Sequence, residues 1–197
     1  MENDFEFEKA FWGDCCNTFD EEAKHYVYAR LMGIPLYCPG GSISCGFSVG
    51  QKSILDLGGG PVSMLLKTKQ FTKAKVVDPI TYPKWTAERY AAHGIELQVA
   101  KAEQICESGW DEVWIYNCLQ HVDDPELILH NALQAGKIVR IFEWIDIPAH
   151  EGHPHELTRK NLDLWLGTKG NTVNLLESGC YGHAYFAVRT SPCGTGR

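Results

Sequence analysis

The chain has 197 residues, of which 44% are hydrophobic and 22% are charged, and its formal net charge is -7. This length and composition predict one globular domain that buries about 70% of the surface its unfolded chain would expose. The negative charge gives no electrostatic reason to expect a nucleic-acid partner. The acidic segment 1–9 lacks the basic start of a secretory signal, and no apolar run reaches the length of a membrane span.

The sequence contains eight cysteines, and no two of them form a C-x-x-C pair. Their spacing does not match the disulfide framework of a small secreted protein. We therefore expect reduced thiols in a cytoplasmic protein. The eight positions are Cys15, Cys16, Cys38, Cys45, Cys106, Cys118, Cys180 and Cys193.

The first fifty residues differ in pattern from the rest of the chain. Residues 20–32 begin with three acids and are followed by Gly33, which is typical of a capped helix. Residues 34–50, rich in proline and glycine, indicate a loop or an irregular hairpin. We expect residues 1–50 to form a helical extension over a ligand site, and residues 51–197 to form the ligand-binding core of one compact domain.

From residue 53 onward, apolar strand-like runs alternate with helical patterns. The expected strands are 53–57, 74–78, 95–100, 112–117 and 137–144, and the expected helices are 61–70, 83–93, 103–108, 125–135 and 158–167. Repeated strand-helix units predict a parallel sheet with helices on both faces.

The chain ends with two further strands, 172–177 and 184–190, whose connection is too short for a crossover. They should therefore pair antiparallel. The fold class predicted is α/β, a Rossmann-like three-layer α/β/α sandwich. Its seven-stranded sheet should be mostly parallel and should end in an antiparallel hairpin.

A nucleotide cradle is predicted where the strand 53–57 opens onto Gly58, Gly59 and Gly60, because glycines let the backbone turn sharply and approach a ligand. Asp56 precedes them. Asp78 ends the next strand, where dinucleotide-binding folds have the acid that binds the ribose. Ser63 replaces the third glycine of the dinucleotide fingerprint, which disfavours nicotinamide and flavin cofactors. Asp56 could instead order the turn, and Asp78 could be a solvated turn acid.

The segment 56–60 resembles the D-x-G-x-G motif of class I S-adenosylmethionine-dependent methyltransferases, with Asp56, Gly58 and Gly60 in the three fixed places. The resemblance implies that S-adenosylmethionine is the cofactor, that Asp78 binds both ribose hydroxyls, and that Asp56 orients the amino group of the cofactor. The segment "DEVWIYNCLQHV", residues 111–122, is similar to the fourth strand of that family and the residues after it. It implies that Asn117 to His121 line the site near the methionine moiety.

One position departs from the family pattern. After its third strand the family commonly has an acid, a small residue and another acid near the adenine, whereas this chain has Lys101, Ala102 and Glu103. Glu103 would then hold the adenine amine alone, or the Ala102 backbone would do so. Glu103 could also be a helix first-turn acid stabilised by the helix dipole.

Candidate general bases gather after the fifth strand in "EWIDIPAHEGHPHELT", because loops at the carboxyl ends of parallel strands surround the ligand. His155 and His153 are the leading candidates, followed by His121, since histidine has a suitable intrinsic pKa. These histidines could instead satisfy backbone groups beside the expected N-cap Thr158. With His150 they could also supply metal ligands, but the spacing is not that of a zincin and we expect no metal.

The predicted function is methyl transfer from S-adenosylmethionine to a small molecule such as a sugar, a nucleotide-sugar or a secondary metabolite. No nucleic acid or membrane is expected as a partner, and the oligomeric state stays open. One alternative keeps the cofactor but uses it for lyase or aminocarboxypropyl chemistry. Another is a non-catalytic partner subunit with the same fold. Aromatic residues before the core would narrow the acceptor pocket or pack at the surface; they are Trp12, Tyr26 and Tyr28.

Overall fold

The computed structural model describes residues 5–38, 40, 45–176 and 182–190. A seven-stranded sheet runs through the described part in the order β6-β5-β3-β7-β8-β10-β9. Its strands are β6 (Ile95–Val99), β5 (Lys73–Asp78), β3 (Ser53–Leu57), β7 (Trp110–Tyr116), β8 (Gly136–Trp144), β10 (His183–Thr190) and β9 (Asn171–Asn174). The first five are parallel, and β10 is antiparallel to both β8 and β9. The predicted sheet and its closing hairpin are confirmed.

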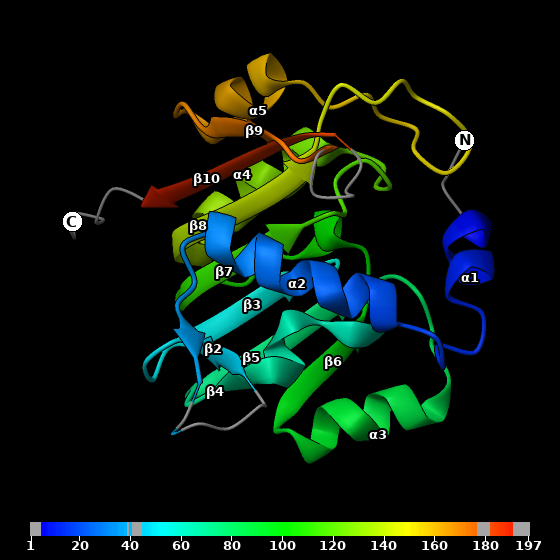
Figure 1. Cartoon of the computed structure of the whole chain (residues 1–197), viewed down its shortest axis with the longest axis vertical. Coiled ribbons are helices and arrows are strands. Elements are labelled where there is room, and N and C mark those ends of the chain that lie inside the picture. The colour runs from blue at the N-terminus through cyan, green and yellow to red at the C-terminus, as the bar shows by residue number, and fades with distance from the viewer. Residues whose placement is uncertain (1–4, 39, 41–44, 177–181, 191–197) are drawn as a thin grey trace.

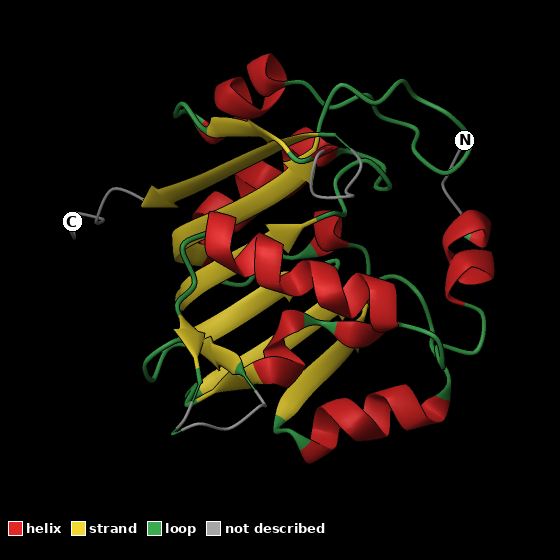
Figure 2. Ribbon diagram, viewed as in Figure 1, coloured by secondary structure: helices red, strands yellow, loops and turns green. Residues whose placement is uncertain are grey.

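Helices cover both faces of the sheet, which confirms the predicted three-layer sandwich (Figures 1 and 2). Helices α2 (Phe19–Leu31) and α3 (Lys84–Ala92) pack on one face, and α4 (Pro125–Ala135) and α5 (Arg159–Leu166) pack on the other. Helix α1 (Glu6–Trp12) lies apart, at the sheet edge where the loop after β8 also runs. Among these helices, none is both long and apolar enough to cross a bilayer.

Strand periodicity places alternate side chains in two cores. In β3, Ile54 packs with Tyr28 and Met32 of α2, whereas Leu55 and Leu57 pack with the α4 and α5 side of the sheet. All five of these side chains are buried. The central strands are apolar on both faces, as expected for a parallel sheet covered on both sides.

Two of the expected helices are wrong. Residues 61–70 form two short 3₁₀ turns, η1 (Gly60–Val62) and η2 (Met64–Lys67), and then strand β4 (Thr68–Lys69). Between the turns Ser63 is extended, with φ −47° and ψ 147°, and its hydroxyl accepts a hydrogen bond from the Leu65 N–H. The expected helix 103–108 is reduced to one 3₁₀ turn, η3 (Ala102–Gln104).

Two strands from the segment before the main sheet join β4 in a small second sheet, in the order β1-β2-β4. Strand β1 (Leu36–Tyr37) pairs antiparallel with β2 (Gly46–Ser48), as the expected irregular hairpin requires. Cys38 and Cys45 lie beside these strands with Cα atoms 4.5 Å apart and form a disulfide. The expectation of reduced thiols is therefore wrong for this pair; Cys180 and Cys193 lie outside the described residues.

A buried ion pair ties helix α2 to the sheet. Glu112 of β7 is 2% exposed and accepts hydrogen bonds from Arg140 of β8 (Nε, 2.7 Å) and from Lys52 (Nζ, 2.6 Å). Arg140 also donates to the Met32 carbonyl at the end of α2, at 2.7 Å. Although burial would raise the pKa of Glu112, these cations hold it below its ordinary value.

Replacing Arg140 with alanine should lower the free energy of unfolding by about 3 kcal/mol, because it leaves a buried carboxylate with one cation and removes a cap from α2. Urea denaturation measures the change. Lys84→Ala is the matched control, since Lys84 pairs with Glu88 at the exposed surface and should leave the denaturation midpoint unchanged. Equal midpoints for all three proteins would show that the pair contributes nothing.

Candidate functional site

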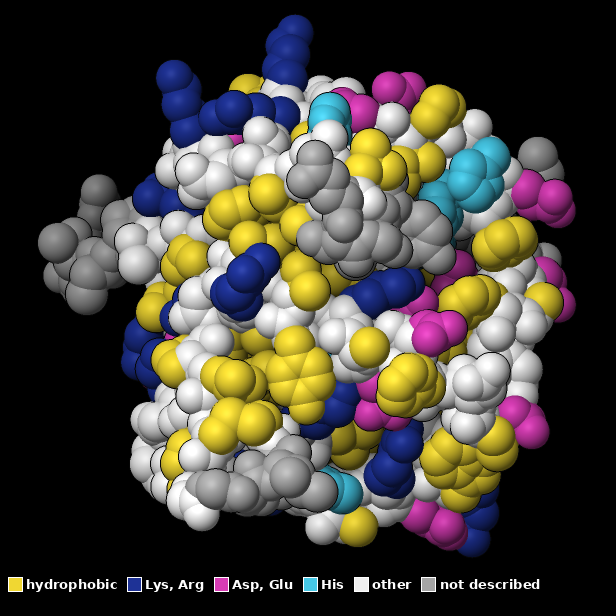
Figure 3. Space-filling model, in the orientation of Figure 1, with side chains coloured by type: hydrophobic (Ala, Val, Ile, Leu, Met, Phe, Trp, Pro, Cys, Tyr) yellow, Lys and Arg dark blue, Asp and Glu magenta, His cyan; other side chains and the backbone are white. Residues whose placement is uncertain are grey.

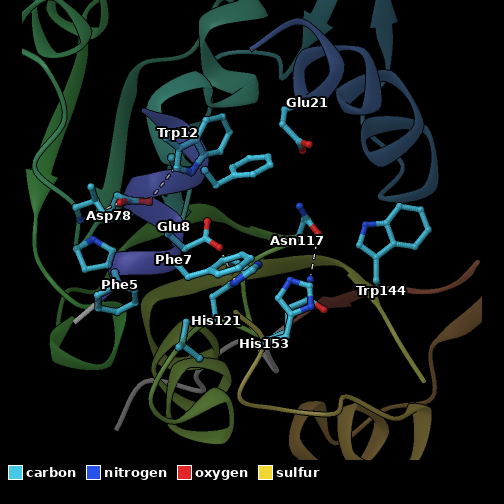
Figure 4. Close-up of a pocket in the computed structure, with 18 of the residues that line it drawn as sticks. Phe5, Phe7, Glu8, Trp12, Glu21, Asp78, Asn117, His121, Trp144 and His153 are labelled. Carbon is cyan, nitrogen blue, oxygen red and sulfur yellow. Dashed lines mark hydrogen bonds and ion pairs between the residues drawn. The ribbon is translucent and has the colours of Figure 1, made fainter. Parts of the chain in front are cut away.

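A cavity of about 310 Å³ lies where the parallel strands end, between the glycine turn after β3, helix α1 and the loop after β8. Figure 4 shows Asp78 and Trp12 toward one end of it and Trp144 toward the other. Asn117 and His153 lie between these ends. The carboxyl edge of a parallel sheet is the usual place for a ligand in such folds.

The glycine turn forms one wall of the cavity. Gly58 has φ +75°, and a Cβ there would lie 2.6 Å from the Cβ of Cys118. Gly60 has φ +62°, and a Cβ there would approach the ring of Trp12 at 3.5 Å and the hydroxyl of Tyr82 at 3.9 Å. Gly60 and Trp12 thus line the cavity together, with the ring of Trp12 close to the glycine backbone.

Asp78 ends β5 and lines the same wall. Its Oδ2 accepts a hydrogen bond from the Gly60 N–H at 3.0 Å, and its Oδ1 accepts from the Ile80 N–H and the Tyr82 hydroxyl, each at 3.0 Å. Burial raises the pKa of Asp78 to about 6, against the lowering effect of these donors. The structure therefore places a buried carboxylate, with one lone pair left on Oδ2, beside the glycine turn.

Asp56 and Gly59 lie behind this wall. Asp56 is fully buried, and its Oδ2 accepts hydrogen bonds from the Ser63 hydroxyl and from the Tyr116 hydroxyl (2.6 Å). A Cβ at Gly59 would lie 2.7 Å from that same oxygen. Neither residue lines the cavity, so the geometry favours the alternative in which Asp56 orders the turn.

Asn117 and Gln120, on the turn after β7, line the middle of the cavity. Asn117 has φ +52°, in the left-handed region that asparagine tolerates better than most residues. The buried Glu143 of β8 fixes this turn, because its Oε1 accepts from the Cys118 and Leu119 N–H groups, each at 3.1 Å. Burial raises the pKa of Glu143 to about 7. Glu143 lies in strand β8, whereas the sequence analysis grouped it with the loop that carries the candidate bases.

Glu103 does not line the cavity. Its Oε1 accepts hydrogen bonds from the Asp123 and Asp124 N–H groups, at 2.9 and 3.1 Å. These contacts fix the start of helix α4, where Asp124 is the N-cap. The geometry therefore favours a structural role for Glu103.

Two of the three candidate bases line the cavity. The rings of His121 and His153 meet edge to face with centroids 4.5 Å apart, and His150 lies 4.4 Å from His153 on the other side. Burial, followed by the charges of His121 and His150, lowers the pKa of His153 to about 4. Its Nδ1 is buried and has no hydrogen-bond partner among the described residues.

The leading candidate, His155, lies outside this cavity, in a neighbouring one. Its Nε2 is 2.8 Å from the Val122 carbonyl, so it donates a hydrogen bond that ties the loop to the segment after β7. This matches the alternative in which the histidine satisfies a backbone group. Among the described residues no group of three or more His, Cys, Asp and Glu side chains is arranged to hold a metal ion.

Helix α1 closes the cavity from outside. Phe7, Phe11 and Trp12 line the cavity, and no residue of α1 is itself buried. Figure 3 shows histidine, acidic and hydrophobic side chains together on this side of the molecule. Of the aromatic residues expected near the acceptor, Trp12 is at the cavity, whereas Tyr28 is buried against the sheet.

Sequence reasoning missed two residues that shape the site, Glu8 and Tyr116. Glu8 lies 2.9 Å from Nδ1 of His121. Residues 5–8 alternate phenylalanine with glutamate, and this pattern indicates that one short segment can make both an apolar and an anionic contact. Tyr116 sits within an apolar strand run, where a lone polar group marks a buried hydrogen bond.

Neither a protein-family model nor a curated protein matches this sequence, but solved structures do. A chain of the complex containing the Haloferax volcanii Trm112 methyltransferase activator matches with a TM-score of 0.64 at 12% identity, over 98% of this chain and 100% of that chain. The DhpI-SAH complex gives 0.60 at 15% identity, over 94% and 93%. A SAM-dependent methyltransferase from Aquifex aeolicus gives 0.53 at 16% identity, over 71% and 82%.

Strand order, the closing antiparallel hairpin and these similarities together identify the fold. The chain has the class I S-adenosylmethionine-dependent methyltransferase fold. The matched structures are not all methyltransferases, since one of them is the [4+2]-cyclase SpnF. At these identities the similarity is evidence for the fold and leaves the reaction to be argued from the site.

The buried Asp56 gives a pH-dependent prediction. Burial raises its pKa from 3.8 to about 7, so the folded chain keeps a proton that the unfolded chain releases at lower pH. Its contribution to stability therefore falls as pH rises through that window. Asp56→Asn, which cannot ionise, should gain stability relative to the unsubstituted protein between about pH 5 and about pH 8, as measured by denaturation at both values.

Asp111→Asn is the control for this experiment. The hydrogen bond from Lys137 lowers the pKa of Asp111 to about 2, so its contribution is constant above about pH 5. Parallel pH profiles for Asp56→Asn and the unsubstituted protein would show that Asp56 is ionised throughout.

Proposed function

We propose that this chain is a methyltransferase that uses S-adenosylmethionine and acts on the hydroxyl group of a small acceptor. The observation that carries the proposal is the pairing, in one cavity, of a ribose-type carboxylate at Asp78 with a neutral, partly buried histidine at His153. The fold supports the cofactor class, and the cavity supports a small acceptor.

The residues at the Asp78 end fit the cofactor. Gly60 and Asp78 line this end, where Oδ2 of Asp78 can accept a hydrogen bond from one sugar hydroxyl and Oδ1 can accept from a second in place of Tyr82. Ile80 and Val122 supply an apolar lining for a purine ring. Asn117 and the backbone of Gly58 would lie along the methionine portion.

The bound cofactor supplies an electrophilic methyl group on a sulfonium. The chain positions the acceptor in line with that methyl group and excludes water with the aromatic side chains of α1. The imidazole of His153 would take up the proton of the acceptor hydroxyl during this transfer. A pKa of about 4 makes His153 a weak base, which suffices because an oxygen that is being methylated becomes strongly acidic.

The acceptor end of the cavity favours an apolar body with a hydroxyl group. Phe7, Phe11, Trp144 and Ile147 line it, and this lining is mostly hydrocarbon. Such walls stack well against a planar ring or the apolar face of a sugar. Among the classes named from sequence, a secondary metabolite fits this lining better than a highly charged nucleotide-sugar.

Asp78→Asn should weaken the binding of S-adenosylmethionine and S-adenosylhomocysteine by at least about tenfold, because it replaces a carboxylate acceptor of two hydroxyls with a neutral amide. Isothermal titration calorimetry measures both affinities. Glu103→Ala is the control and should leave them unchanged, since Glu103 lies outside the cavity. Loss of binding in Glu103→Ala with retention in Asp78→Asn would move the nucleoside site elsewhere.

His153→Gln should lower kcat by roughly 10² to 10⁴, the range for loss of a general base. Radiolabelled methyl transfer to a panel of simple phenols and alcohols measures turnover. His155→Gln is the matched control and should retain activity, because His155 donates to a backbone carbonyl outside the cavity. If only His155→Gln is impaired, the assignment of the base is wrong.

A second candidate keeps the cofactor fold but transfers no methyl group, and the match to the cyclase SpnF favours it. A panel that adds conjugated polyenes to the phenols and alcohols distinguishes the two, when unlabelled products are followed by mass spectrometry. Methylated product supports the first proposal. A rearranged product of unchanged mass, with no S-adenosylhomocysteine released, supports the second.

A further inference from the structure

The proposed reaction does not use one clear feature of the cavity, which is the contact between helix α1 and His121. Oε1 of Glu8, in α1, lies 2.9 Å from Nδ1 of His121. The Gly152 carbonyl lies 2.8 Å from the same nitrogen. Both neighbours are acceptors, so Nδ1 of His121 carries a proton and donates it. The side chains of Glu8 and His121 are 18% and 15% exposed, which shields the pair from water.

The charges around His121 come from three elements. Burial alone would lower the pKa of His121, but Glu8 from α1, the Gly152 carbonyl and Glu143 of β8 raise it above its ordinary value. His153 and His150, in the loop after β8, are the neighbouring bases. Glu21 and Lys24 of α2 line the same cavity but neutralise each other as an ion pair. Two neighbouring histidines with different pKa values take different roles in proton transfer.

Few other contacts hold α1 in place. The ring of Phe7 packs on the backbone at Gly152, and the ring of Trp12 lies over Gly60. No residue of the helix is buried, and Phe5 and Gly13 on either side of it both have positive φ. An ion pair with His121 is therefore a large part of what docks this helix.

We propose that Glu8 is a positioning residue: when α1 docks, its carboxylate holds a proton on His121, and this leaves His153 as the only neutral imidazole of that pair facing the acceptor. The inference rests on the proposed function and extends it. Docking of α1 would both close the cavity and determine that His153 acts as the base.

Charge balance supports this role. A cationic cofactor and a protonated His121 together place two positive charges in a small cavity, and the Glu8 carboxylate offsets one of them. During methyl transfer the positive charge leaves the sulfonium and the acceptor proton brings an equal charge to His153. The net charge of the closed cavity is thus the same before and after the step.

Docking should depend on pH with a defined sign. The ion pair raises the pKa of His121, so its contribution to docking is fully present below the pKa of the undocked side chain, about 6.5. The contribution is lost as pH rises through the docked value. Helix α1 should therefore release from the cavity as His121 loses its proton.

The test is an NMR titration of the full chain without any acceptor, following the ring signals of His121 and the indole N–H signal of Trp12. In the unsubstituted protein the two signals should titrate with one midpoint. Glu8→Gln should lower the His121 midpoint by roughly one pH unit and abolish the pH response of Trp12 in that range. Glu6→Gln is the matched control, since Glu6 is on the same helix and pairs with Lys9 at the surface; it should change neither signal.

An unchanged His121 midpoint in Glu8→Gln, or a Trp12 signal that does not follow His121, would overturn the proposal. Glutamine has nearly the shape of glutamate and α1 has no buried residue, so the variant tests charge rather than folding. The titration is independent of turnover and of cofactor binding. Failure of the proposed function would appear separately, as absence of S-adenosylmethionine binding in calorimetry.

Discussion

The buried carboxylate of Asp56 constrains the whole binding edge of this molecule. It accepts hydrogen bonds from the hydroxyls of Ser63 and Tyr116, and the Ser63 N–H in turn donates to the Tyr90 hydroxyl at 2.8 Å. Tyr90 also donates to the Gly60 carbonyl at 2.8 Å. The glycine turn is therefore bonded to β7 and α3 as well as to its own strand. A ligand at this edge meets a turn that is already fixed, which reduces the entropy lost on binding.

The same network explains why the turn leads into 3₁₀ turns and not into a helix. Ser63 must stay extended for its hydroxyl to reach Asp56, and an extended residue interrupts a helix at that position. The face of the sheet that such a helix would cover is instead packed by α2, through Tyr28, Ala29 and Met32. The N-terminal fifty residues thus contribute one helix to the core and one to the cavity, and both depend on the turn at Asp56.

The sheet could be predicted from sequence because its strands are continuous apolar runs of suitable length, and Asp78 could be placed because it ends one of them. The helix expected after Gly60 failed, since helical spacing cannot reveal a serine that a buried acid holds extended. The hydrogen bond from His155 to the Val122 carbonyl could not be predicted either, because it joins residues that are 33 positions apart in the sequence. Glu8 was missed for the same reason, as it meets His121 only through the tertiary fold.

The position of β10 within the sheet has a consequence for how the chain is made. This strand is the last element of the described chain, yet it lies between β8 and β9, pairing with β8 over residues 184–190 and with β9 over residues 183–186. Until residues 183–190 leave the ribosome, one side of β8 has no partner and β9 has none from this sheet. Unpaired strand edges recruit other chains. The growing chain therefore carries an unpaired edge on β8 from the time residues 136–144 are made until β10 pairs with them.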